Sequence, residues 1–249
     1  MSTETALLER WVWLNVSLVI ALLAGAFRWF LERPHLRRQL HTSPSLTPYR
    51  PVWEMPWIIH PLRLLYAVGI PAIALLWRGV LTPSGLGLKP FFWAADQTLS
   101  SLSGSWHSWV RDLGWTCAFA GGFWVLIVLA DRMAKRLAPP HVTRHSLSAA
   151  LREAVYHQAH WAFYREPFVL LFGVGLGAWL GLLPVAAEAL LNPARWTDLQ
   201  SSTRGRDLLI RVGLAILSAM LFIQTQNIWL MALADSTLVW ILGHQHETQ

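Results

Sequence analysis

Charged residues and cysteines are scarce in this sequence, and each scarcity argues against a class of protein. Charged side chains make up 14% of the 249 residues, whereas a typical soluble domain has about 25%. Cys117 is the only cysteine, which rules out an intrachain disulfide and argues against a zinc site built from cysteines. Lys89 and Lys135 are the only lysines, so the net charge of +6 rests on arginine.

The apolar residues, by contrast, are abundant and gathered into long runs. Hydrophobic residues make up 54% of the chain, and its mean hydropathy is +0.38. A helix needs roughly 17–25 predominantly apolar residues to cross the ~30 Å hydrocarbon layer of a bilayer. The runs at 14–27, 115–130, 168–183 and 208–223 approach this length. The sequence therefore predicts an all-α, polytopic transmembrane helix bundle, with residues 1–249 forming a single integral membrane domain.

The first apolar run is predicted to be a membrane helix rather than a cleavable signal peptide. Residues 1–10 carry Glu4 and Glu9 and lack a basic segment, and no small-residue cleavage site follows the run. Tryptophans flank many of the runs, where interfacial aromatic belts place them. The flanking tryptophans are Trp11, Trp13, Trp29, Trp57, Trp77, Trp115, Trp229 and Trp240.

Hydropathy and the prolines together predict about seven membrane helices. They are expected at about residues 11–31, 61–81, 114–133, 146–165, 168–191, 208–223 and 227–242. The stretch 82–112 contains Pro83, Pro90 and a cluster of serines and glycines. We expect it to be mostly an extracytoplasmic loop, with tryptophan-containing segments that lie at the membrane interface.

The distribution of arginine predicts the topology. Stretch 146–165 is less apolar than the other runs, so whether it crosses the membrane is open. If it crosses, the three basic loops at 28–50, 131–145 and 192–207 all lie in the cytoplasm; if it does not, the last of them lies outside. The positive-inside rule favours crossing. We therefore expect a multi-pass protein of the cell inner (plasma) membrane, with the N-terminus outside and the C-terminus in the cytoplasm.

Stretch 146–165 also holds the first candidates for a functional site. Glu153, His157, His160 and Tyr164 are spaced four, three and four residues apart, which places them within an arc of roughly 60° on a helix. A carboxylate and two imidazoles on one face could coordinate Zn²⁺ or another divalent metal. The alternative, which we weight more heavily, is that these polar groups hydrogen-bond across a helix bundle or extend to its edge.

Asp235 is a second ionisable residue whose burial in the membrane is energetically costly, because it lies near the middle of the last apolar stretch. A charge at that depth costs at least ~2.5 kcal/mol. Asp235 is expected to be protonated or to pair with Arg211, His157 or His160, and it is the natural fourth metal ligand.

The remaining sequence patterns give weaker indications of function. Gly173, Gly175 and Gly177 are best explained by close helix packing. No nucleophile motif arranges the serines, and no basic, aromatic-rich patch on a soluble module predicts nucleic-acid binding. A small-molecule transporter is a weak alternative, because no inverted repeat is visible.

Two stretches resemble the CAAX-protease and bacteriocin-processing (CPBP) family of intramembrane metalloproteases. Residues 69–88, which end in Ser84-Gly85-Leu86-Gly87-Leu88, are similar to a family helix that leads into a Gly-Leu linker. Residues 224–235 are similar to the start of its closing helix. The resemblance implies a protease-like core at 146–243, with Glu153 as the catalytic carboxylate.

The sequence also departs from this family at its functional positions. In the family, a pair of glutamates precedes an arginine. One alignment places Glu153 at the pair and Gln158 at the arginine, whereas the other keeps Arg165 as the arginine and puts His160 at the pair. Asp235 stands where the family has a histidine, and 168–191 lacks the family's mid-sequence histidine.

Two functional hypotheses follow from these departures. The favoured one is a non-catalytic relative, a pseudoenzyme or accessory subunit that contacts the lipid bilayer and another membrane protein. The other is an active intramembrane metalloprotease. In it, Glu153, His157, His160 and Asp235 would hold the metal, Arg165 and Tyr164 would lie nearby, and a peptide would be the substrate.

Overall fold

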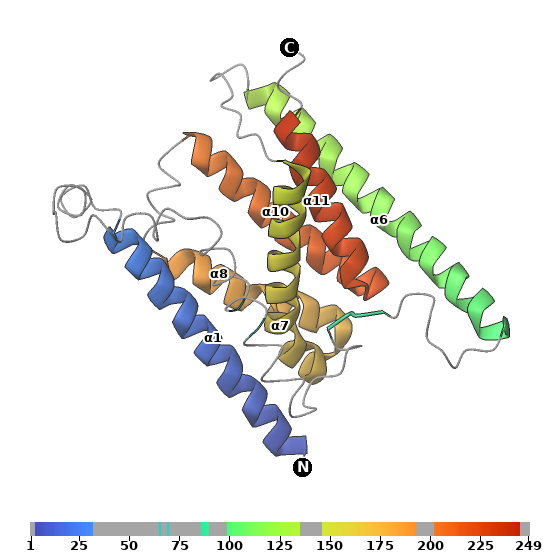
Figure 1. Ribbon diagram of the computed structural model, residues 1–249, viewed down its shortest axis with the longest axis horizontal. Coiled ribbons are helices and arrows are strands. Elements are labelled where there is room, and N and C mark those ends of the chain that lie inside the picture. The colour runs from blue at the N-terminus through green and yellow to red at the C-terminus, as the bar shows by residue number, and fades with distance from the viewer. Residues whose placement is uncertain are drawn as a thin grey trace. The chain divides into compact units, whose positions relative to one another are not determined.

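The chain is all-helical over the residues that the structure describes. The computed structural model describes residues 3–31, 86–89, 99–134, 146–192 and 202–244, together with positions 65 and 69. These parts contain six helices, which are labelled in Figure 1. They are α1 (Thr3–Leu31), α6 (Leu99–Ala134), α7 (Leu147–Leu180), α8 (Leu182–Leu191), α10 (Ser202–Thr225) and α11 (Ile228–His244).

Three of these helices are long and apolar enough to cross a membrane. Their candidate spans are Leu8–Phe27, Trp106–Met133 and Gly205–Thr225. The pair α7 and α8 forms a fourth if the two helices are one broken span. The prediction of an all-helical chain is confirmed over the described residues, and three to four apolar helices are long enough for a multi-pass membrane protein. The helix expected at 61–81 lies outside the described residues, and the full count of seven stays a prediction.

Contacts along the chain define two compact units. The first comprises Met1–Val80 and Leu183–Ser201, and the second comprises Leu81–Leu182 and Ser202–Gln249. In the first unit, α1 has a narrow buried stripe at helical spacing, formed by Leu14, Ser17 and Ala21. Most of its other apolar side chains are exposed, as expected for a helix whose solvent is lipid.

Helix α6 begins earlier than the sequence predicted. Residues 99–112 were expected to be loop, yet they form the first third of α6. Between Pro90 and Pro139 the sequence has no proline, so nothing interrupts the helical hydrogen bonds. Asp112 is fully buried and forms an ion pair with Lys89, with 2.5 Å between Oδ2 and Nζ. That ion pair holds the extended part of α6 against residues 86–89.

Helix α7 continues through Pro167, where the sequence predicted a break between two helices. The break comes six residues later at Gly173, whose backbone has φ 75° and ψ 172°. Only glycine adopts this region without a large steric cost. The expected separate helices at 146–165 and 168–191 are therefore joined, and the chain turns at Gly173 instead.

After Gly173 the chain doubles back on α7. A Cβ atom at Gly177 would collide with the backbone of Val169, and one at Gly181 would lie 2.6 Å from Cα of Arg165. In a straight helix, residues 165 and 181 would be ~24 Å apart. Of the three glycines predicted to pack closely, Gly177 does so, against its own helix, whereas an added Cβ atom at Gly173 or Gly175 would meet nothing within 4 Å.

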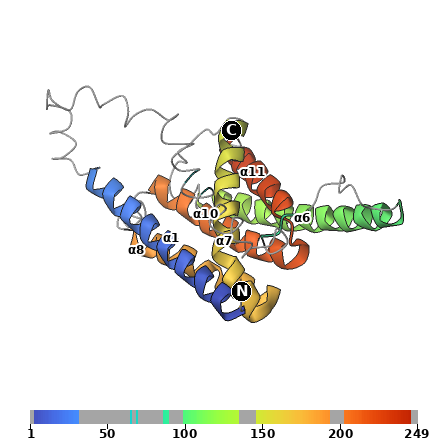
Figure 2. The same cartoon turned by 60° about the horizontal axis from the view of Figure 1, so that its bottom comes forward.

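The core of the second unit is built by α7, α10 and α11. Helix α11 packs on α7, and α10 packs on both α7 and α6, as the two views of the ribbon show (Figures 1 and 2). Small residues allow close approach: Gly213 of α10 leaves room for the ring of Phe123 of α6, which would lie 2.6 Å from a Cβ atom. The buried apolar residues of α10 and α11 include Leu214, Leu217, Leu221, Phe222, Leu230, Met231, Ala234 and Leu238.

A tight turn joins α10 to α11, and residues 86–89 dock onto it. Asn227 caps α11 by accepting hydrogen bonds from the backbone N–H groups of Trp229 and Leu230. The carbonyl oxygen of Gly87 accepts from the N–H of Ile228 at 2.8 Å. The Trp229 indole donates to the carbonyl oxygen of Lys89 at 3.2 Å. These contacts place the described part of the Gly-Leu linker at the start of α11.

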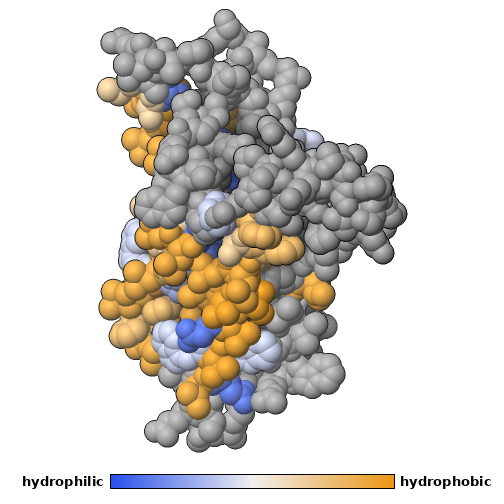
Figure 3. All heavy atoms as spheres, turned by 90° about the vertical axis from the view of Figure 1, so that its left-hand side faces the viewer, coloured by the Kyte–Doolittle hydropathy of each residue, from blue (hydrophilic) through white to orange (hydrophobic). Residues whose placement is uncertain are grey.

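Apolar side chains dominate the coloured part of the surface on one face of the molecule, with few polar residues among them (Figure 3). Along α6, only 6% of the Trp106–Met133 span is buried. Large exposed apolar patches are unusual for a soluble protein. The exposed apolar side chains of α6 therefore match contact with a lipid bilayer.

Candidate functional site

A buried polar network joins the three core helices of the second unit. Asp235 of α11 accepts a hydrogen bond at Oδ2 from Nε2 of Gln158 of α7, at 2.5 Å. The other end of the same amide, Oε1, accepts from Oγ of Ser218 of α10 at 2.9 Å. All three residues are at most 1% exposed. One glutamine thus uses both ends of its amide to hold two other helices.

Four of the five polar side-chain atoms of Gln158, Ser218 and Asp235 have a hydrogen-bond partner. Ser218 also lies 3.7 Å from Sδ of Met231, a second and weaker acceptor. Asp235 Oδ1 is the exception, because it is buried and finds no hydrogen-bond partner in the described part of the chain. Such networks fix helix register, because each buried polar group left unpaired costs ~1–3 kcal/mol.

Glu153 and His157 lie in a different, half-buried cluster. His157 Nε2 is 4.0 Å from Glu153 Oε2 and 3.5 Å from Nη1 of Arg211 on α10. The ring of His157 stacks on Trp161, with 5.2 Å between centroids and 7° between planes. The pairing of His157 with Arg211 means that an imidazole and a guanidinium share this edge of the bundle.

His160 and Tyr164 form a third pair on α7. Their ring centroids lie 4.2 Å apart with 53° between planes. Tyr164 is completely buried, whereas His160 is half-buried. The tyrosine is therefore part of the packed core, and its ring contacts the imidazole at a tilt.

Arg165 is the most deeply buried cation of α7, at 3% exposed. Its guanidinium carbon lies 3.5 Å from the centroid of the Phe222 ring on α10, a cation–π contact. The alignment that kept Arg165 as the family's arginine thus selects a residue inside the core. The nearby Glu166 is buried as well.

The four predicted metal ligands are not gathered around one point. Within the described ranges, no group of three or more His, Cys, Asp or Glu side chains lies close enough to hold a metal ion. The expected pairing of Asp235 with a histidine is replaced by its hydrogen bond to Gln158. Glu153 and His157 do lie together, as the helical spacing predicted.

The sequence reasoning missed Gln158, and the reason is geometric. A second stripe of α7 has the same three- and four-residue spacing as the face through Glu153 and His157, but it is rotated from that face by ~100°. It consists of positions 150, 154, 158, 161 and 165. All five are buried, whereas Glu153, His157 and His160 are half-buried. Alanines at 150 and 154 were a signal for the packed face, because small residues line contacts between membrane helices.

Comparison with known protein families, with curated proteins and with solved structures finds no match to this chain.

Proposed function

We propose that this integral membrane protein acts as a non-catalytic accessory or scaffold subunit, related to the CPBP proteases as a pseudoenzyme. The observation that carries the proposal is the hydrogen bond from Gln158 to Asp235. The carboxylate that stands in for the family's closing-helix histidine is engaged in joining α11 to α7. Its role is then to fix how the bundle packs.

The surroundings of Glu153 support the same proposal. In the family, a glutamate would activate a water molecule that attacks a peptide bond. Here Glu153 lies beside His157, which in turn contacts Arg211. This arrangement resembles a structural contact at the edge of the bundle, in which the Glu153–His157 pair lies within α7 and His157 contacts α10 through Arg211.

The orientation and partners belong to the same proposal. The protein would lie in the inner membrane with its N-terminus outside and its C-terminus in the cytoplasm. Its lipid-facing helices, of which α6 is the most exposed, would contact the bilayer and another membrane protein. A pseudoenzyme of this kind would act by binding a membrane partner or substrate peptide without cleaving it.

The test separates an accessory role from catalysis. In cells from which the gene is deleted, we expect Glu153→Gln and His157→Ala proteins to restore function as well as the wild type. Membrane levels of each variant would be matched by immunoblotting. Gln158→Leu is the control, because it removes a packing contact and should impair function only as far as it lowers protein level.

An active metalloprotease would give the opposite results. Purified wild-type protein would carry stoichiometric zinc or another divalent metal, measured by mass spectrometry, and Glu153→Gln or His160→Ala would abolish function at normal protein level. That combination would contradict the accessory role and favour a site made of Glu153, His157, His160 and Asp235.

A further inference from the structure

Arg165 of α7 is a buried cation that needs an acceptor for its hydrogen bonds. Its atoms Nε and Nη2 are buried, and neither has a hydrogen-bond partner among the residues that the structure describes. The ring of Phe222 lies against the guanidinium at 3.5 Å, but such a contact covers the face and leaves the N–H bonds, which point outward in the plane, unsatisfied. Buried donors without acceptors are costly. A small polar group beside Arg165 would therefore stabilise the core.

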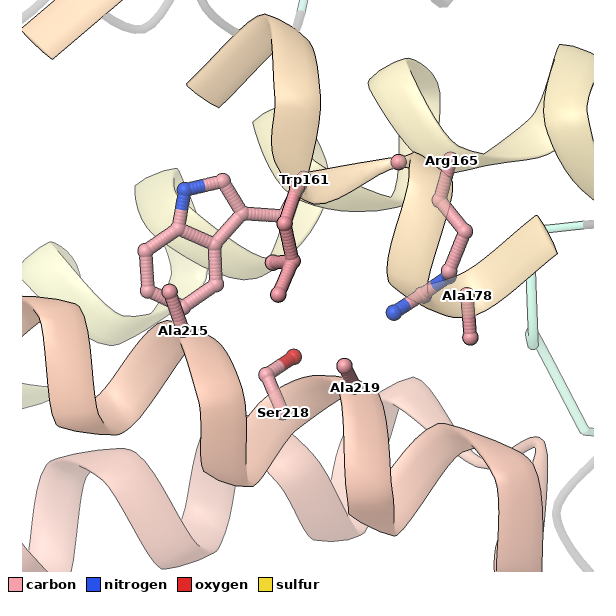
Figure 4. Close-up of a pocket in the computed structure, with 8 residues that line it drawn as sticks. Trp161, Arg165, Ala178, Ala215, Ser218 and Ala219 are labelled. Carbon is pink, nitrogen blue, oxygen red and sulfur yellow. The ribbon is translucent and has the colours of Figure 1, made fainter. Parts of the chain in front are cut away.

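A pocket at the end of Arg165 has room for one such group. Its volume is about 10 Å³, close to the least that one water molecule requires. The close-up shows the end of the Arg165 side chain and the hydroxyl of Ser218 of α10 facing each other across it, with the indole nitrogen of Trp161 turned away (Figure 4). The rest of the lining is made of apolar residues. The side chains around the pocket thus offer one cation and one hydroxyl to its occupant.

The Ser218 hydroxyl presents an acceptor, and not a donor, to this pocket. Its single hydrogen is donated to Oε1 of Gln158 at 2.9 Å, which leaves lone pairs of Oγ available. Arg165, in contrast, can only donate. A group that accepts from a guanidinium on one side and donates to a hydroxyl on the other fits both walls. Water does both, whereas a halide ion only accepts and would face the lone pairs of Ser218.

We propose that the pocket binds one water molecule, which accepts a hydrogen bond from Arg165 and donates one to Oγ of Ser218. The water extends the buried network into a chain in which every group donates to the next: Arg165 to the water, the water to Ser218, and Ser218 to Gln158. The other end of the Gln158 amide then donates to Asp235. The chain therefore runs in one direction, from a guanidinium to a carboxylate, and hydrogen bonds aligned in this way strengthen one another.

The water is the link through which Arg165 acts on the network. Within the described residues, the side-chain hydrogen bonds of Ser218 go to Gln158 and Met231, and none joins it to Arg165 directly. An energetic coupling between Arg165 and Ser218 therefore reports the bridge. The inference does not rest on the proposed accessory role, because it concerns the interior of the bundle.

A double-mutant cycle on the full-length protein in detergent micelles measures this coupling. Arg165→Met and Ser218→Ala are compared with the double variant by equilibrium unfolding. We expect the double variant to raise the unfolding equilibrium constant at least ~3-fold less than the product of the two single effects, because the bridge is lost only once. Ser236→Ala is the matched control, since Ser236 is a buried serine of α11 whose hydroxyl donates to the carbonyl oxygen of Leu233. Its effect and that of Arg165→Met should multiply within ~2-fold.

A density map of the wild-type protein that resolves ordered water tests the same point without a variant. One water within hydrogen-bond distance of Arg165 and of Oγ of Ser218 is the expected result. An unoccupied pocket would overturn the proposal, and so would effects of Arg165→Met and Ser218→Ala that multiply as in the control. Stabilisation by chloride relative to gluconate, at equal ionic strength and lost in Arg165→Met, would also overturn it, since the occupant would then be an anion.

Discussion

At the scale of single residues, Gln158 joins three helices of the second unit. Its amide contacts both α10 and α11 by side-chain hydrogen bonds, through Ser218 and Asp235. Hydrogen bonds between membrane helices contribute only ~0.6 kcal/mol on average. Losing a partner costs more than that average, because the other group remains buried and unpaired.

Substitution of Gln158 should therefore cost more than one average hydrogen bond between membrane helices. We expect Gln158→Leu to reduce the free energy of unfolding by ~1–3 kcal/mol, because Asp235 and Ser218 lose their partner together. The double variant Gln158→Leu with Asp235→Leu should recover part of the loss, because no buried carboxylate is left. Unfolding in mixed detergent micelles measures both.

Asp235→Asn is the control for charge, because it keeps an oxygen that can accept from Gln158. We expect it to cost less than Gln158→Leu. An equal loss of stability for both variants would mean that the charge of Asp235, and not the hydrogen bond, holds the helices.

At the scale of elements, α7 shows how one glycine sets the path of the chain. Pro167 lies inside a helix and is tolerated there, although a proline removes one backbone hydrogen bond. Membrane helices accommodate this, since neighbouring groups compensate for the freed carbonyl. Gly173 instead ends the helical conformation, and it brings Gly177 and Gly181 against the arm that precedes it.

Gly173→Ala should therefore be destabilising, by ~1–3 kcal/mol, because a Cβ atom is strained at this positive φ. Gly175→Ala is the matched control: it lies two residues away, with nothing within 4 Å of its added Cβ atom, and should be neutral or slightly stabilising. Unfolding temperatures of the two variants in detergent check the pair. Equal behaviour would contradict the turn at Gly173.

At the scale of the whole molecule, the number and direction of membrane crossings govern any function. There are three candidate spans in the described residues, and a fourth if α7 and α8 count as one. The number of crossings therefore depends on the path of residues 146–191. A helix that turns at Gly173 can cross the membrane once, or enter and return.

Reporter fusions after Lys135 and after Asp198 measure this directly. We expect both to report the cytoplasm, because arginines are concentrated in both loops. A fusion after Arg50 is the control and should also be cytoplasmic. If the reporter after Asp198 lies outside while the one after Lys135 lies inside, residues 146–191 make an odd number of crossings and the predicted topology is wrong.

The sequence by itself determined the all-helical class and the apolar runs long enough to span a membrane, because the cost of placing polar groups in lipid acts locally, on each run of ~20 residues. It also determined that Glu153 and His157 share a face of α7, since helical spacing alone sets that.

Only the tertiary structure decided which face of α7 is buried and where α7 turns. Two stripes of α7, one through Glu153 and one through Gln158, have the same spacing, and the burial of one depends on α10 and α11. The partner of Asp235 and the neighbours of Arg165 are likewise far away in the sequence. Such contacts depend on how helices pack, which local spacing does not specify.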